Sequence, residues 1–173
     1  MHNYTTIIGV IENNTVEVSP ENNQAKILAF TILERRPILV ASEFLSGAVH
    51  VSTNQFNENS KMFADFKLVP ELNHHLMEGL RFPTSNINTH VFLFINSHLY
   101  STHNQKRMKL TQQVVEDNNI ETISIKMNAE SKLTQVFEEI TLMAFTNYYV
   151  AMLEKIDPAP IPFVDWFKEE LSK

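Results

Sequence analysis

Apolar residues form two patterns along the chain, short unbroken runs and longer segments with helical spacing. The runs at residues 38–41 and 91–95 have the length and continuity of parallel strands that are buried on both faces. Residues 66–69 and 121–126 predict two further short strands. The chain therefore predicts at least four strands, each separated from the next by a segment of another type.

Between these runs, apolar residues recur every three or four positions, which predicts helices. The clearest start is Ser19-Pro20-Glu21, where the serine can cap and the proline suits the first turn. The prolines of the stretch 157–162 predict a rigid, extended break before the last helix. The predicted helices cover residues 19–35, 42–57, 71–80, 102–117, 132–155 and 164–171.

Strands that alternate with helices predict a parallel sheet that is covered on both faces. Short, right-handed connections then favour an α/β fold, a three-layer αβα sandwich with a mostly parallel, flavodoxin-like sheet. We expect one domain over residues 20–173, preceded at 1–19 by an N-terminal extension or hairpin. Ligands of such sheets bind beyond the carboxyl ends of the strands at a topological switch point, here after Ala41 and Ile95.

Composition narrows the class of protein. The formal net charge is −6 without a basic block, which argues against a nucleic-acid or anionic-membrane surface. The chain has no cysteine, so it carries no disulfide and no thiolate nucleophile. Its three glycines lie far apart, which excludes the GxGxxG motif and the P-loop. Because no segment resembles a signal peptide or a transmembrane helix, we expect a cytoplasmic protein.

Glu58 is the first candidate for chemistry, because it lies between Asn57 and Asn59 at a predicted helix end. A carboxylate that amides hold near the protein interior can have a raised pKa and accept a proton from carbon. The alternative is a solvated glutamate that pairs with Lys61 or is capped by its neighbours. The residues alone leave both interpretations open.

A histidine and a lysine are the next candidates. His74, beside Asn73, is either a proton shuttle or a surface histidine. Lys168 either brings a positive charge to a substrate oxygen or lies on the wet face of the last helix. His74 and His75 point about 100° apart on a helix, which disfavours a shared metal ion. We expect no metal and no cofactor.

Hydroxyl side chains near predicted strand ends and helix starts form a candidate phosphate cradle. Serine and threonine at such positions are helix-capping residues first, and together with helix N-termini they can also hold a phosphate group. The residues concerned are Ser42, Ser46, Ser97 and Thr102.

Four segments, in this order, resemble one enzyme family. They are RPILV at 36–40, NENSK at 57–61, PELNH at 70–74 and the tail from Asp157-Pro158 to WFKEEL. Together they resemble the C-terminal SIS (sugar isomerase) domain of the bifunctional phosphoglucose/phosphomannose isomerases. The resemblance implies an αβα SIS fold and the interconversion of aldose and ketose 6-phosphates through a cis-enediol, without a metal.

The resemblance also implies roles for the candidate residues. Glu58 would be the base that carries a proton between C1 and C2, and His74 would assist ring opening from a neighbouring subunit. Lys168 would be the C-terminal active-site lysine. The expected partners are a phosphorylated sugar and either a second copy, in a homodimer, or a second SIS domain. Expected substrate contacts include the amides that flank the two motif residues, Asn57, Asn59 and Asn73.

The chain departs from the family pattern in several ways. Family enzymes carry two SIS domains in tandem, whereas these 173 residues suit one. The Ser/Thr-rich phosphate loops of the N-terminal domain are not found, and Ile161-Pro162-Phe163 replaces a threonine that bears on mannose 6-phosphate use. Two hypotheses remain. One is an isomerase that takes its phosphate site from a second domain or copy. The other is a non-catalytic SIS module that binds sugar phosphate or mediates dimerisation.

Overall fold

The computed structural model describes the backbone of residues 2–173 and the side chains from residue 6 onward. In the labels, η marks a 3-10 helix. The elements in chain order are α1 (His2–Asn14), η1 (Pro20–Asn22), α2 (Gln24–Ile32), β1 (Arg36–Ser42), η2 (Glu43–Leu45), α3 (Ser46–Glu58), β2 (Asp65–Val69), η3 (Glu71–His74), α4 (Leu76–Gly79), α5 (Asn86–Thr89), β3 (His90–Ser97), α6 (Thr102–Asp117), β4 (Glu121–Met127), α7 (Lys132–Leu153) and α8 (Pro162–Leu171).

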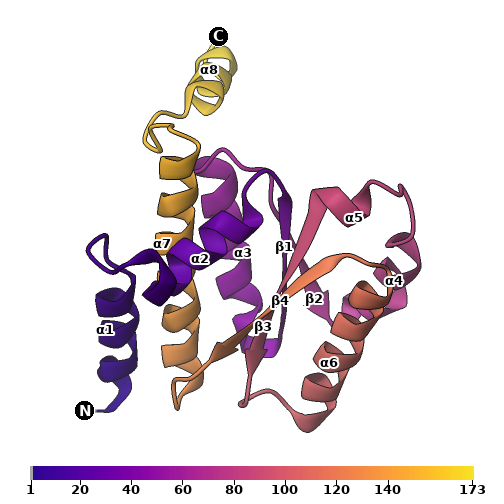
Figure 1. The fold of residues 1–173 in the computed structure, drawn as a ribbon. Helices are drawn as coiled ribbons and strands as arrows, with labels where there is room; N and C mark the ends of the chain where they lie inside the picture. Colours follow the sequence, from indigo (N-terminus) through magenta and orange to yellow (C-terminus); the bar gives the residue numbers. More distant parts are fainter. Residues whose placement is uncertain (1) are drawn as a thin grey trace.

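The strands form one parallel sheet in the order β2-β1-β3-β4, as the alternation of strands and helices predicts (Figure 1). Leu39 in β1 pairs with Phe66 on one side and with Leu93 on the other. The chain passes from β1 to β2 and then crosses to β3, so the strand order reverses between β1 and β3. The switch point therefore lies at the carboxyl ends of these two strands, Ser42 and Ser97.

Helices cover both faces of the sheet, which confirms the three-layer αβα sandwich (Figure 1). One face carries α3 and α7, with α1 and α2 packed against α7, and the other face carries α6 and α4. Phe56 of α3 and Met143 of α7 are fully buried with Leu93 and Phe94 of β3. Because α3 and α7 each follow a strand, both run back and end at the edge where the strands begin, the amino edge.

We expected an N-terminal extension or a hairpin at 1–19, and the hairpin is wrong, because the described part of this segment contains the helix α1. Ile7 and Val10 lie about one turn apart and are half-buried, and α1 packs against α7. Asn14 ends the helix, and its Oδ1 accepts a hydrogen bond from the backbone N–H of Ala25 at 2.8 Å. The asparagine pair that suggested a turn is therefore a helix end that is anchored to α2.

Several predicted helix starts lie elsewhere. Ser19-Pro20 opens only the short η1, and α2 begins at Gln24 behind Asn23, whose side chain accepts from the N–H of Lys26 at 2.9 Å. Likewise α3 begins after η2 instead of being capped by Ser42. The segment after β2 is divided between η3 and α4. In each case a 3-10 turn precedes the α-helix that periodicity had predicted.

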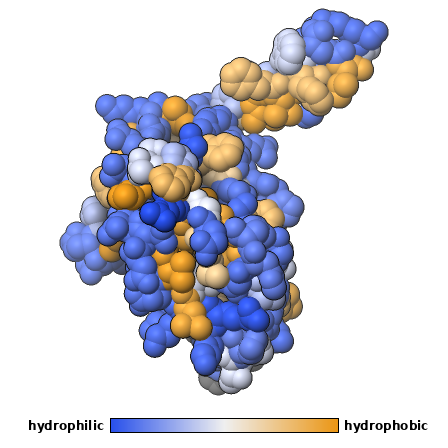
Figure 2. Space-filling model, turned by 90° about the vertical axis from the view of Figure 1, so that its right-hand side faces the viewer, coloured by the Kyte–Doolittle hydropathy of each residue, from blue (hydrophilic) through white to orange (hydrophobic). Residues whose placement is uncertain are grey.

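The last helix, α8, projects from the amino edge of the body (Figure 1). None of its residues is buried, and its apolar side chains gather along one side (Figure 2). Phe163 is 86% exposed and Trp166 is 61% exposed. Within the described part of the chain, no helix combines the length and the apolar character that a membrane crossing requires.

Candidate active site

Glu58 is the last residue of α3, and its side chain is exposed at the amino edge. The helix ends there because the chain folds back on Phe56. The Phe56 carbonyl accepts from the Met62 N–H at 3.1 Å and from Ser60 Oγ at 2.8 Å. Lys61 has a left-handed φ of 54° in this turn. The carboxylate therefore stands at the tip of a tight turn and not near the protein interior.

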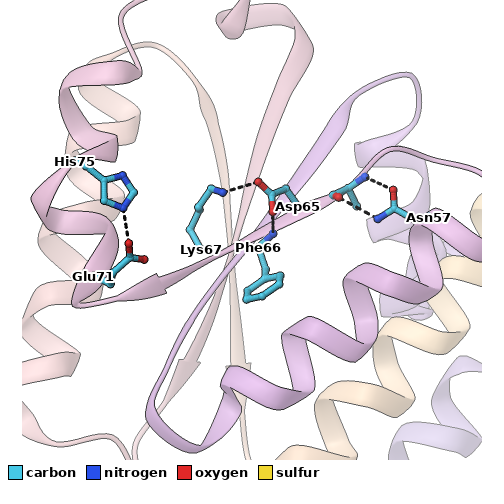
Figure 3. Close-up of polar contacts among 7 residues, drawn as sticks. Asn57, Asp65, Phe66, Lys67, Glu71 and His75 are labelled. Carbon is cyan, nitrogen blue, oxygen red and sulfur yellow. Dashed lines mark hydrogen bonds and ion pairs between the residues drawn. The ribbon is translucent and has the colours of Figure 1, made fainter.

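Asn57 joins this turn to the sheet (Figure 3). Its Nδ2 donates to the carbonyls of Thr53, at 2.9 Å, and Ala64, at 3.0 Å, and its Oδ1 accepts from the Ala64 N–H at 3.3 Å. Ala64 directly precedes β2, so the amide connects the end of α3 to the start of a strand. Asn57 thus positions the turn that carries Glu58, while Asn59, on the other side, is half-buried.

Lys61 connects the same turn to the C-terminal segment. Its Nζ donates to the carbonyl oxygens of Glu58, at 2.6 Å, and Pro158, at 3.1 Å. Pro158 belongs to the extended stretch before α8, so this bond brings the last helix towards the end of α3. The sequence marked Lys61 only as a partner for the Glu58 carboxylate, and the contact with the backbone was missed.

One cavity of about 620 Å³ lies between the end of α3 and α8, and both Glu58 and Lys168 line it. Lys61 adds a second ammonium group, and Phe163 and Val164 give an apolar wall. The structure thus brings together two of the three predicted catalytic residues, a carboxylate and an ammonium group from helices distant in sequence.

His74 lies at the opposite edge of the sheet, at the end of η3, which follows β2, and its side chain is exposed. The preceding residues anchor it. Leu72 is buried, and Asn73 Nδ2 donates to Thr111 Oγ1 of α6 at 2.7 Å. One copy of the chain therefore does not bring His74 to Glu58.

The second histidine of this motif has a local partner. His75 Nε2 lies 2.7 Å from Glu71 Oε1, one helical turn earlier (Figure 3). Across the described residues, no three His, Cys, Asp or Glu side chains gather as they would around a metal ion.

The serines expected in the phosphate cradle lie at the carboxyl edge, away from the Glu58 cavity. Ser42 Oγ donates to the Val69 carbonyl at 2.8 Å, and Ser97 Oγ donates to Gln135 Oε1 at 2.5 Å. Both serines are buried. Their hydroxyl hydrogens are therefore engaged inside the domain.

Glu43 stands at the switch point beside the remaining hydroxyls. Its Oε1 accepts from the Ser101 N–H at 2.9 Å, and from Ser101 Oγ and Asn104 Nδ2, both at 2.8 Å. Burial acts to raise the pKa of Glu43, but these hydrogen bonds outweigh it and lower the pKa. Ser46 and Thr102 are the first residues of α3 and α6. Ser46 follows Glu43 by three positions, and Thr102 follows Ser101, which bonds the Glu43 carboxylate. Its negative charge disfavours a phosphate group, so the geometry does not support a cradle here.

The sequence interpretation missed Glu139 of α7, a fully buried carboxyl group. Its Oε2 accepts from Ser52 Oγ at 3.0 Å, and within the described residues its Oε1 has no partner. Burial raises the pKa of Glu139 to about 8, against the opposing effect of the Ser52 hydrogen bond. Glu139 shares a helical face with Val136 and Met143, and that spacing was the available signal for its burial.

A family model of the bacterial phospho-glucose isomerase C-terminal SIS domain matches residues 21–171. The chain belongs to this family. The match spans all four strands and the segments that carry Glu58, His74 and Lys168. It confirms the resemblance that the motif segments indicated.

The chain is similar to proteins named bifunctional phosphoglucose/phosphomannose isomerase. The one from Aquifex aeolicus is 25% identical over 162 residues, which are 94% of this chain and 50% of that protein. The one from Caldicellulosiruptor bescii is 27% identical over 161 residues, 91% of this chain and 47% of that protein. This chain therefore spans about half the length of these relatives.

Solved structures share the fold. A glucose-6-phosphate isomerase like protein from Thermus thermophilus has a TM-score of 0.78 and 21% identity, over 94% of this chain and 54% of that one. A hypothetical protein from the same organism has a TM-score of 0.81 and 12% identity, over 99% of this chain and 49% of that one. At these identities the likeness shows the fold alone.

Proposed function

We propose that this chain carries the proton-transfer groups of an isomerase that interconverts hexose aldose 6-phosphates and fructose 6-phosphate. The observation that carries the proposal is that Glu58 and Lys168 line the same cavity. Membership of the SIS domain family supports a phosphorylated sugar as the substrate class. The names of the relatives make glucose and mannose 6-phosphates the candidate aldoses.

Glu58 is the proposed base. The carbonyl at C1 of the open aldose acidifies the hydrogen on C2, so a positioned carboxylate can remove it. The C–H electron pair then forms the C1–C2 double bond, and O1 gains a proton to complete a cis-enediol. Glu58 returns its proton to C1, and the O2 hydroxyl loses its proton as the ketone forms.

Lys168 is proposed to stabilise the charge that develops on the sugar oxygens, because its ammonium group lines the same cavity as the base. Lys61 has its Nζ engaged with two backbone carbonyls, so its proposed role is to hold the turn. His74 would open the sugar ring from a second subunit, since in one copy it lies at the far edge of the sheet.

Binding of the substrate's phosphate group requires residues from outside this chain. We propose that it is held by a second SIS domain, such as the part of the relatives that this chain does not span, or by a second copy. The exposed apolar face of α8 supports such a partner, because exposed apolar patches mark interaction sites. A cytoplasmic location stays a prediction from the sequence. We do not propose Ser42, Ser46, Ser97 or Thr102 as phosphate ligands.

A second candidate function is a non-catalytic SIS module that binds sugar phosphate or mediates dimerisation. The exposure of Glu58 favours it, because proton transfer from carbon benefits from a site that excludes water. In this case α8 would serve only as a contact surface.

A coupled assay with fructose 6-phosphate tests the isomerase, with glucose 6-phosphate and mannose 6-phosphate followed separately. Glu58→Gln should lower turnover by at least about a hundredfold, because loss of a general base has that effect. Glu78→Gln, the same change at an exposed glutamate of α4, is the matched control and should keep parental turnover. Circular dichroism establishes that each variant is folded.

The outcomes separate the two candidate functions. Equal turnover of parent and Glu58→Gln would remove Glu58 from the mechanism. A folded parent that binds fructose 6-phosphate in calorimetry but shows no turnover would favour the binding module.

A further inference from the structure

A second cavity opens at the amino edge of the sheet, beside α4 and α5. Its volume is about 380 Å³, within the range of small-molecule sites. Arg36 and His90, the first residues of β1 and β3, line it together with Phe92. Leu80 and Ser85 line it from the connection between β2 and β3. It shares no lining residue with the cavity at Glu58, so it is a separate site.

Arg36 gives this cavity a positive charge, and His90 adds a second basic group. They are register partners on neighbouring strands, so their side chains emerge on the same face of the sheet. Among its described lining residues there is no Asp or Glu, although the chain has a net charge of −6. Glu121, which begins the next strand, is paired with Arg35 instead.

The His90 ring is held in a defined orientation. Thr89 Oγ1 donates to the Ser85 carbonyl at 2.9 Å, so towards His90 Nδ1, also at 2.9 Å, it acts as the acceptor. Nδ1 therefore carries the ring proton, and a second proton would bind at Nε2. Burial, and then the charge of Arg36, lowers the pKa of His90. A bound anion would oppose both effects with a counter-charge.

The shape and chemistry of the cavity define a class of ligand. The two adjacent basic groups match a dianion, and a guanidinium fork matches the oxygens of a phosphate group. The remaining walls are largely apolar, with Leu76 and Ile120, and the exposed ring of Phe82 adds to them. We propose that this cavity binds a small phosphate monoester with an apolar or aromatic body.

Phenyl phosphate is the probe, and NMR of the His90 ring in the full chain is the readout. Saturable shifts of the His90 signals are expected, with a rise of its pKa by about one unit in the presence of the probe. Inorganic phosphate, which lacks the ring, should bind at least about tenfold more weakly. Arg36→Gln should weaken phenyl phosphate binding at least about tenfold, because it removes charged hydrogen-bond donors. Lys109→Gln, on α6 outside the cavity, is the matched control and should bind as the parent does.

The proposal is overturned if His90 does not respond, if Arg36→Gln binds equally well, or if Lys109→Gln weakens binding as much. Should Arg36→Gln not fold, the parent decides, since an anion beside the ring should give a saturable rise of the pKa of His90. Glu58→Gln should bind phenyl phosphate like the parent, because Glu58 lies outside this cavity. The result therefore stands or falls separately from the isomerase proposal.

Discussion

At the scale of single residues, two asparagines hold the motif residues in place. Asn57 bonds the backbone before β2, and Asn73 bonds Thr111 of α6. Beside each amide stands an exposed side chain, Glu58 or His74. An anchored turn with an exposed carboxylate or imidazole can present that side chain to another domain or copy.

Asn57→Ala removes the hydrogen bonds that join α3 to the start of β2. We expect a loss of about 1–3 kcal/mol in the free energy of unfolding, because the N–H and the carbonyl of Ala64 lose their side-chain partner. Urea denaturation measures this loss. Asn54→Ala, at an exposed amide of the same helix, should stay near the parental value, and equal midpoints for the two variants would contradict the prediction.

Glu139 predicts a stability that falls as pH rises. Its pKa of about 8 in the folded chain exceeds the ordinary value of 4.5, so between these values the folded chain holds a proton that the unfolded chain has released. This contribution is complete below pH 4.5 and is lost as pH rises towards 8, by up to ~1.4 kcal/mol per unit. Urea denaturation over this pH range measures the slope.

Glu139→Gln isolates the contribution of this carboxyl group. The amide is neutral at every pH, so the variant should lose this part of the slope and gain stability over the parent near pH 8. Glu78→Gln, at an exposed site, should keep the parental slope. A slope in Glu139→Gln as steep as in the parent would show that other groups titrate.

At the scale of elements, α8 is a helix that buries none of its residues against the rest of the domain. It has ten residues, none of them buried, and helices this short are marginal in water without tertiary packing. Lys61 holds the stretch before it near α3 through the Pro158 carbonyl. The helix is thus tethered beside the candidate site while its apolar side stays open to a partner.

Phe163→Ser tests whether α8 joins copies of this chain. We expect the parent to self-associate and the variant to dissociate at least about tenfold more readily, since burying a phenyl ring contributes about 1.5–3 kcal/mol. Sedimentation equilibrium measures both, and Trp166 fluorescence should shift to the blue as the parent associates. Phe30→Ser, at a ring of α2 that is 58% exposed, is the control. If Phe163→Ser and Phe30→Ser weaken self-association equally, α8 is not the contact between copies.

At the scale of the whole molecule, the proposed site is divided. Glu58 and Lys168 line one cavity at the amino edge, and His74 lies at the carboxyl edge. The chain spans about half the length of its relatives. The proposed isomerase would therefore take His74 from a second copy, and its phosphate-binding residues from a second domain or a second copy.

Mixing two inactive variants tests whether copies share a site. If His74 acts in the partner's site, a mixed dimer of Glu58→Gln and His74→Gln contains one intact site. Activity should then return to about a quarter of the parental value, because half of randomly formed dimers are mixed. Each variant mixed with the parent supplies the reference. No recovery, despite exchange of subunits, would show that His74 of one copy does not serve the Glu58 site of the other. A His74→Gln variant that is active by itself would show that His74 is not required.

Local patterns were sufficient for most elements. The apolar run at 91–95 became the core of β3, and the helix predicted at 102–117 has those bounds, since periodicity reports which side of an element is buried. The order of strands and helices also predicted the αβα sandwich. Patterns did less well at 1–19, where loose alternation suited a hairpin or one side of a helix, and packing against α7 decided for the helix.

The sequence by itself determined most of the elements, the fold class and the family, because periodicity and short motifs are local properties of the chain. Only the tertiary structure decided that Glu58 and Lys168 share a cavity while His74 stands apart, and that Glu43 stands at the switch point. It also placed Arg36 beside His90. These relations depend on how the helices and strands pack. The sequence around one residue does not indicate which distant residue will lie beside it in the fold.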